Sequence, residues 1–131
     1  MRGRKPQLVI DNRAVDRVPN APGWMSKDAK AEWRRIMPAL VDRRVLTQAD
    51  LGSVENFCVA IATAREAERH LQAHGHVYTT AAGEFKRNPA STTLKDAVQT
   101  SRQLAAELGL TPVSRSRPSI RDDDDADSLL D

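Results

Sequence analysis

The chain is short of cysteine and has no long hydrophobic run. Its single cysteine, Cys58, excludes an internal disulfide framework and is typical of a reducing compartment. No apolar run approaches the roughly 18 residues of a membrane-spanning helix. Residues 1–6 are not followed by the apolar stretch of a signal peptide, so we expect none. These absences together predict a protein of the cytoplasm.

The chain also lacks a recognisable catalytic constellation. Its six glycines are isolated, so none belongs to a phosphate-binding loop, and no carboxylate pair has an acid–base spacing. His70 and His74 have a spacing that can bind zinc, but no third and fourth ligand follows at a useful distance. Histidines near the end of a helix are also favoured there by its dipole. We therefore expect no enzymatic activity, no metal and no cofactor.

Charge is abundant and unevenly distributed. The 131 residues are 40% hydrophobic and 29% charged, which predicts one globular domain. Residues 122–131 contain six aspartates and no base, so residues 1–121 hold 20 bases against 12 acids, a net charge of +8. This asymmetry favours a polyanionic partner. The alternative interpretation is that the charge serves solubility alone.

Residues 27 onwards have the pattern of a first amphipathic helix. Ser26 is a suitable N-cap, and an apolar stripe recurs at three- and four-residue steps from Ala29 to Leu40. Pro38 lies inside this pattern and removes a backbone donor. We therefore expect a kink or break near residues 34–37.

The second helix has the clearest boundaries. Thr47 to Asp50 has the form of a capping box, and the helix can run to His74 with Gly75 as its terminator. Its first half is apolar on almost every side, which the neighbouring helices of one small chain cover poorly. We therefore predict self-association through its apolar residues, which are Leu51, Val54, Phe57, Cys58, Ala60, Ile61 and Ala64.

Residues 76–88 and 90–108 complete the fold. The first stretch is typical of a short β-hairpin or ordered loop, which must lean on a helix because two strands alone are marginal. Asn88 and Pro89 then open a third helix that ends at Gly109, and Thr111 can begin one more short turn. The fold class is therefore all-α: a small bundle of three main helices with a short β-hairpin or ordered loop.

The chain divides into three parts. Residues 1–23, rich in proline and bases, predict a flexible N-terminal arm, residues 24–113 a helical core and oligomerisation domain, and residues 114–131 a disordered tail with an acidic end. The tail combines charge with an apolar pair, which indicates capture by a partner. The predicted partner-binding residues are Asp122, Asp123, Asp124, Asp125, Leu129 and Leu130.

Two basic segments point to DNA. Residues 2–6, Arg-Gly-Arg-Lys-Pro, resemble arms that lie in the minor groove, and the first helix places four bases where they can clamp phosphates. The alternatives are an ordinary basic tail and a solvated helix face partly paired with Asp28 and Glu32. The join at residues 43–47 could be a helix-turn-helix corner, although the apolar second helix tells against it. The predicted DNA-binding residues are Arg2, Arg4, Lys5, Arg13, Arg17, Lys27, Lys30, Arg34 and Arg35.

Several segments, taken in order, carry a family resemblance. They are Arg2 to Pro6, Pro22 to Ser26 with Ala29 and Trp33, Leu46 and Thr47 with Asp50, Gly75, Lys86 to Ala90, and Gly109 to Arg115. Over residues 1–117 the chain resembles the small terminase subunit family of tailed double-stranded DNA bacteriophages. The resemblance implies a protein of the host cytoplasm that forms a helical ring, binds viral DNA, and recruits and regulates a large ATPase and nuclease subunit.

Two other classes stay open at this stage. A helical DNA-binding transcriptional regulator would also be small and basic, and it would be a dimer on a short palindromic site. An adaptor would bind protein and show little salt-dependent DNA affinity. The number of subunits in the native particle separates the ring from the dimer.

Overall fold

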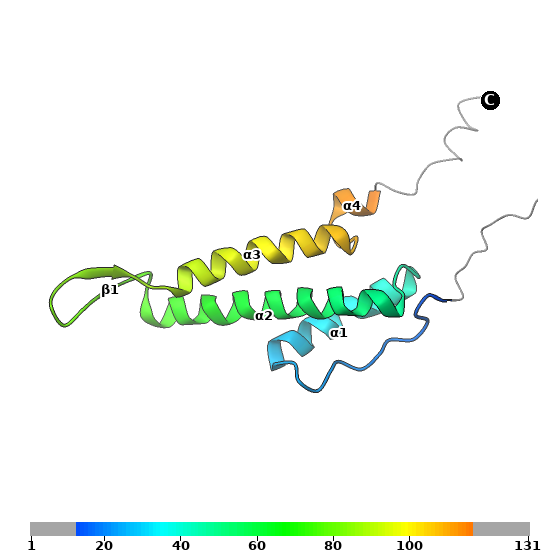
Figure 1. The fold of residues 1–131 in the computed structure, drawn as a ribbon, viewed down its shortest axis with the longest axis horizontal. Helices are drawn as coiled ribbons and strands as arrows, with labels where there is room; N and C mark the ends of the chain where they lie inside the picture. The colour runs from blue at the N-terminus through cyan, green and yellow to red at the C-terminus, as the bar shows by residue number, and fades with distance from the viewer. Residues whose placement is uncertain (1–12, 117–131) are drawn as a thin grey trace, which may run out of the picture.

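The computed structural model describes residues 13–116 and shows two long antiparallel helices with a third packed against one of them (Figure 1). The elements are α1 (Lys27–Asp42), the 3-10 turn η3 (Gln48–Asp50), α2 (Leu51–His74), β1 (Val77–Thr79), β2 (Phe85–Arg87), α3 (Ala90–Glu107) and α4 (Pro112–Ser116). The prediction of a mainly helical fold with three main helices and a short hairpin is confirmed. Because α4 runs to Ser116, the first residues of the predicted tail are helical.

Helix α1 begins where its cap predicts. The Ser26 hydroxyl accepts a hydrogen bond from the Ala29 N–H at 3.2 Å, and the stripe from Ala29 to Leu40 is buried. The helix continues through Pro38 to Asp42, so the predicted break does not occur. Pro38 is exposed, and a proline ring on the solvent side costs the helix one hydrogen bond without a clash against the core.

The predicted ends of α2 are both confirmed. The Asp50 carboxylate accepts hydrogen bonds from the Thr47 N–H at 2.8 Å and from the Thr47 hydroxyl at 3.1 Å. These bonds hold the turn η3, which leads into α2. At the other end Gly75 has a φ of 86°, and its N–H donates to the Leu71 carbonyl at 2.7 Å. A left-handed residue here ends the helix and favours glycine.

Helix α3 is anchored at both ends. The Asn88 side-chain oxygen accepts from the Ala90 N–H at 3.0 Å, and Pro89 between them already has helical dihedrals of −59° and −20°, so Asn88 precedes the first helical residue as predicted. At the C-terminal end the Arg43 guanidinium donates two hydrogen bonds, of 3.0 and 2.8 Å, to the Gly109 carbonyl. This contact joins the end of α3 to the end of α1.

Helix α2 lies between α1 and α3, and one chain covers most of its apolar surface. Val54 and Cys58 are fully buried, Phe57 is 4% exposed and Ala60 is 8% exposed. The expectation that one chain cannot cover α2 is therefore wrong for these four residues. The reason is that α3 packs closely through small residues, while the core also receives side chains from outside the main helices, including Val15, Met25, Leu46 and Leu108.

Residues 13–23 are part of this packed body, in contrast to the unpacked arm that the sequence predicts up to residue 23. Val15 is 8% exposed, and its N–H donates to the Leu46 carbonyl at 2.8 Å. The Trp33 indole donates to the Pro19 carbonyl at 2.8 Å, which holds this segment beside α1. The remainder of the predicted arm, residues 1–12, and the predicted acidic tail lie outside the described residues.

Strands β1 and β2 form an antiparallel hairpin that projects past the ends of α2 and α3 (Figure 1). All six strand residues are exposed, so the expectation that the strands lean on a helix is wrong. The hairpin is fixed at its base, where Asn88 donates from its backbone to the His76 carbonyl at 2.8 Å and from its side chain to the Gly75 carbonyl at 2.9 Å.

Candidate nucleic-acid interface

Three bases of α1, Lys27, Lys30 and Arg34, form what we call the basic strip. Their spacing of three and four residues puts them on one side of the helix, along the edge of the buried stripe. Lys27 and Arg34 are exposed and Lys30 is half-buried. Among the described residues none of the three lies within ion-pairing distance of a carboxylate. Their charges are therefore available to a partner.

Arg35, which the sequence grouped with the strip, is used differently. Its Nε donates to Glu32 Oε1 at 2.9 Å, and its Nη2 contacts Oε2 at 2.5 Å. The hydrogen bond to Glu32 raises the pKa of Arg35. The alternative interpretation was that the bases of this helix face pair with carboxylates of the same helix. Among the four bases of α1, it applies to Arg35 alone.

The two carboxylates expected to neutralise the strip face α2 bases. Asp28 forms an ion pair with Arg69, whose hydrogen bond lowers the pKa of the Asp28 carboxyl. Glu32 is 1% exposed and also lies 3.5 Å from Arg65 Nη2. These contacts hold both carboxylates towards other bases, so within the described residues no member of the basic strip forms an ion pair, and Asp28 acts on Lys27 only through its electrostatic field.

The other predicted DNA-binding residues divide between the described and undescribed parts of the chain. Arg13 and Arg17 are exposed on the segment that runs beside α1. Arg2, Arg4 and Lys5 lie outside the described residues. The structure therefore leaves Arg13 and Arg17 exposed on the segment that precedes α1.

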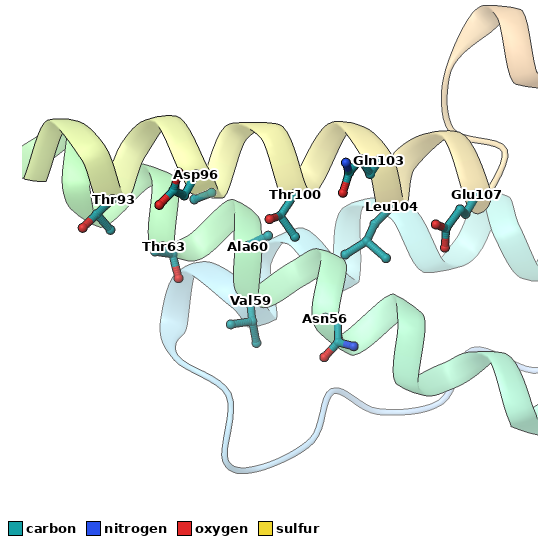
Figure 2. A pocket seen from close by; sticks show the side chains of 11 residues that line it. Asn56, Val59, Ala60, Thr63, Thr93, Asp96, Thr100, Gln103, Leu104 and Glu107 are labelled. Atoms are coloured by element: carbon teal, nitrogen blue, oxygen red, sulfur yellow. The ribbon is translucent and has the colours of Figure 1, made fainter.

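A groove of about 620 Å³ lies between α2 and α3 and has a different character (Figure 2). Its α2 side carries Asn56, Val59 and Thr63, and its charged residues are Asp96 and Glu107 of α3. Residues of α2 advance about 100° per position, so these three point away from the side that Val54 and Cys58 turn towards α1. Figure 2 shows α1 behind α2 when the groove faces the viewer.

The predicted self-association residues mostly lie elsewhere. Val54, Phe57 and Cys58 belong to the core of one chain, and only Ala60 of the predicted set lines the groove. Leu51, Ile61 and Ala64 are half-buried. Sequence reasoning missed Val59, which is 38% exposed in the groove. In the sequence Val59 is simply one member of the apolar run of this helix, and the run does not show which side of the helix stays exposed.

Cys58 and the histidines are not arranged as a ligand set. Burial, with a smaller effect from Glu32, raises the pKa of the Cys58 thiol to about 12. Among residues 13–116 no group of three or more His, Cys, Asp or Glu side chains could hold a metal ion. The His70 and His74 rings lie 4.4 Å apart, and His70 Nδ1 lies 3.3 Å from the Asn88 amide. Within the same range no helix is long and apolar enough to cross a membrane.

The chain matches a known protein family. The family described as phage terminase, small subunit, matches residues 29–125, which include most of α1 and all of α2 to α4. No curated protein and no solved structure matches the chain.

Proposed function

Because the chain belongs to the phage terminase small-subunit family, we propose that it binds viral DNA as a ring and recruits the large subunit that packages the genome. The family match over residues 29–125 is the observation that carries this proposal. Membership of the family supports a role in phage DNA packaging and a non-catalytic subunit. In this proposal the chain acts in the host cytoplasm, and ATP hydrolysis and DNA cleavage belong to the large subunit.

DNA binding is proposed to run through the basic strip together with Arg13, Arg17 and the bases of residues 2–5. The support is that the strip is accessible and lacks acidic partners among the described residues. Lysine and arginine contacts to phosphates fix a protein on the duplex without reading its sequence. Arg35 contributes less in this proposal, because its guanidinium already binds Glu32.

The groove between α2 and α3 is proposed as one of the two subunit contacts of the ring. A closed ring needs two unlike surfaces on each subunit. The groove offers exposed Val59 beside polar Asn56 and Thr63, on the side of α2 away from α1. This position would leave the basic strip open for DNA while subunits associate.

Recruitment of the large subunit is proposed for the acidic tail. Its aspartates, Asp122 to Asp125, and the apolar pair Leu129 and Leu130 lie outside the described residues. The support comes from the sequence, since solubility alone would not require two leucines within a polyanionic segment.

Native mass spectrometry of the full chain tests the ring. Val59→Glu places a charge in the groove and should give smaller particles, because an unpaired charge buried at each contact costs several kcal/mol. Gln99→Glu is the matched control: it adds the same charge at an exposed α3 position outside the groove lining. Ala60→Glu is a poorer probe, because Ala60 is buried within the chain.

A wild-type ring that Val59→Glu dissociates and Gln99→Glu leaves intact supports the groove contact. A wild-type dimer would overturn the ring and favour a transcriptional regulator. A ring that survives Val59→Glu would place the contact on another surface.

Fluorescence anisotropy with duplex DNA at several salt concentrations tests the DNA surface. Replacing Lys27, Lys30 and Arg34 by glutamine should reduce the slope of log affinity against log salt by up to about 2.7, since each lost phosphate contact removes about 0.9. The exposed Arg102→Gln serves as control. An N-terminal truncation should stop at residue 12, because Val15 belongs to the core. Unchanged salt slopes in both the triple glutamine variant and the truncated chain would refute the assignment of DNA binding to these bases.

A further inference from the structure

The β1–β2 hairpin carries exposed aromatic and aliphatic side chains that no described helix covers. Phe85 is 79% exposed, Val77 56% and Tyr78 44%. Its turn is closed by hydrogen bonds from the Thr80 N–H to the Glu84 carbonyl at 2.8 Å and from the Gly83 N–H to the Thr80 carbonyl at 2.9 Å. Exposed apolar side chains on an ordered projection mark an interaction site.

The strand register places a base and an aromatic ring on each face of this hairpin. Partners across an antiparallel pair share a face, and neighbours along a strand alternate. Thr79 pairs with Phe85 and Val77 with Arg87, so Phe85 and Arg87 share one face. Tyr78 pairs with Lys86 on the other face. Neither base forms an ion pair with a described carboxylate.

A recess of about 520 Å³ continues this surface at the base of the hairpin. Arg87 and Lys95 line it together with the hydroxyl-bearing Ser91 and Thr92 at the start of α3. His76, Val77 and Asp96 complete the lining, and Glu84 is the other acid of the region, in the turn. The bases outnumber the acids here, which fits a backbone phosphate better than an acidic protein surface.

We propose that the hairpin enters the major groove of duplex DNA as a two-stranded ribbon, while Arg87 and Lys95 at the recess hold a backbone phosphate. Paired strands lie about 4.8 Å apart, and with side chains on both faces they fit a groove about 12 Å wide, which admits such a ribbon. The leading edge is narrow, because Ala81, Ala82 and Gly83 are small. This inference rests on the proposed DNA-binding function and adds a second DNA contact, separate from the basic strip.

Removing the hairpin bases tests the electrostatic part of the proposal. The full-length Lys86→Gln/Arg87→Gln variant should lower the log affinity against log salt slope by up to about 1.8 on a mixed-sequence duplex, whereas Arg102→Gln should leave it unchanged. Phe85→Ser should weaken binding without changing the slope, because it removes contact area and no charge. All three positions are exposed, so folding is expected to persist, and circular dichroism verifies it.

Tethered cleavage tests the placement directly. Cys58 is buried and its thiol pKa is about 12, so an added surface cysteine is the reactive one at neutral pH. An iron chelate attached at Ala82→Cys, in the hairpin turn, should cleave bound duplex, whereas the same chelate at the exposed Ala106→Cys, towards the other end of α3, should not. Dimethyl sulfate should methylate guanine N7 in the bound duplex less with wild type than with the double variant, because N7 lies in the major groove.

The outcomes separate this inference from the proposed function. The hairpin contact would be overturned if the double variant kept the wild-type salt slope and the wild-type protection of guanine N7. It would also be overturned if the chelate at position 82 did not cleave the duplex. In both cases binding through the basic strip would stand. Loss of the ring in the hairpin variants, with DNA affinity per subunit unchanged, would also overturn it and assign the hairpin to subunit association. A wild-type protein without DNA affinity would overturn both.

Discussion

Glu32 offers a sharp test of how α1 is held to α2. It is 1% exposed, and its carboxylate accepts a hydrogen bond of 2.9 Å from the guanidinium of Arg35 on the same helix. The guanidinium of Arg65 on α2 lies 3.5 Å from the same carboxylate. We consider three replacements: Glu32→Gln keeps the shape without the charge, Glu32→Met fills the site with an apolar chain, and Glu32→Ala empties it.

The contacts of Glu32 determine how much stability each replacement should cost. A hydrogen bond to a charged group contributes about 1.5–3 kcal/mol, and the 3.5 Å contact with Arg65 is too long to add much. The side chains of Arg35 and Arg65 are 66% and 46% exposed, so water solvates both guanidinium groups once the carboxylate is removed. The larger penalty of a stranded buried charge therefore does not apply. We expect Glu32→Gln to cost about 1–2 kcal/mol.

Glu32→Met should be close to neutral, because it also removes the cost of burying a carboxylate, and well-packed apolar replacements of buried ion pairs are often neutral or stabilising. Glu32→Ala should be the least stable of the three, since it leaves a cavity as well. Urea unfolding followed by circular dichroism measures the ranking. All variants are compared at one protein concentration, because association shifts apparent stability.

In a thermal scan each kcal/mol corresponds to a shift in Tm of about 4–8 °C for a domain of this size. Glu32→Met less stable than Glu32→Gln would refute the reasoning, because it would show that polar contacts at this site contribute more than apolar packing. Stability equal to wild type in Glu32→Gln would show that the Arg35 pair contributes nothing measurable.

Three further predictions concern acid, thiol reagents and the tail. Arg69 holds the pKa of Asp28 below its ordinary 3.8, so this pair stabilises the fold fully above about pH 4 and loses its effect as the pH falls through the lower folded-state pKa. Asp28→Asn should therefore flatten the acid side of the stability curve, and an unchanged curve would contradict the assignment. Because burial raises the pKa of Cys58 to about 12, a thiol reagent should label native protein far more slowly than urea-unfolded protein; equal rates would contradict the burial. Truncation after Arg121 removes six aspartates and should raise non-specific DNA affinity at low salt while weakening large-subunit binding in calorimetric titrations. Weaker DNA binding by the truncated chain would refute competition between the tail and DNA.

The sequence by itself determined where α1 and α3 begin and where α2 begins and ends. Ser26, Asp50, Gly75 and Asn88 act within a few residues of the backbone groups they cap or terminate, so their roles are legible from spacing alone. The hairpin was predictable for the same local reason. The family, too, was accessible from the order of short motifs along the chain.

Only the tertiary structure decided which side of α2 remains open. Periodicity identifies Val54, Cys58 and Val59 as members of one apolar run, but it does not show where α1 and α3 pack. Val15 was missed for a related reason: a single apolar residue in an extended segment has no period to reveal its burial.

The tertiary structure also decided which bases stay free. Lys27, Lys30, Arg34 and Arg35 look alike in the sequence, yet Arg35 binds a buried carboxylate while the other three have none within reach among the described residues. Glu32 is buried because α2 passes over it and supplies Arg65 from 33 positions further along the chain. Contacts of this kind depend on how distant segments pack, and local spacing carries no information about them.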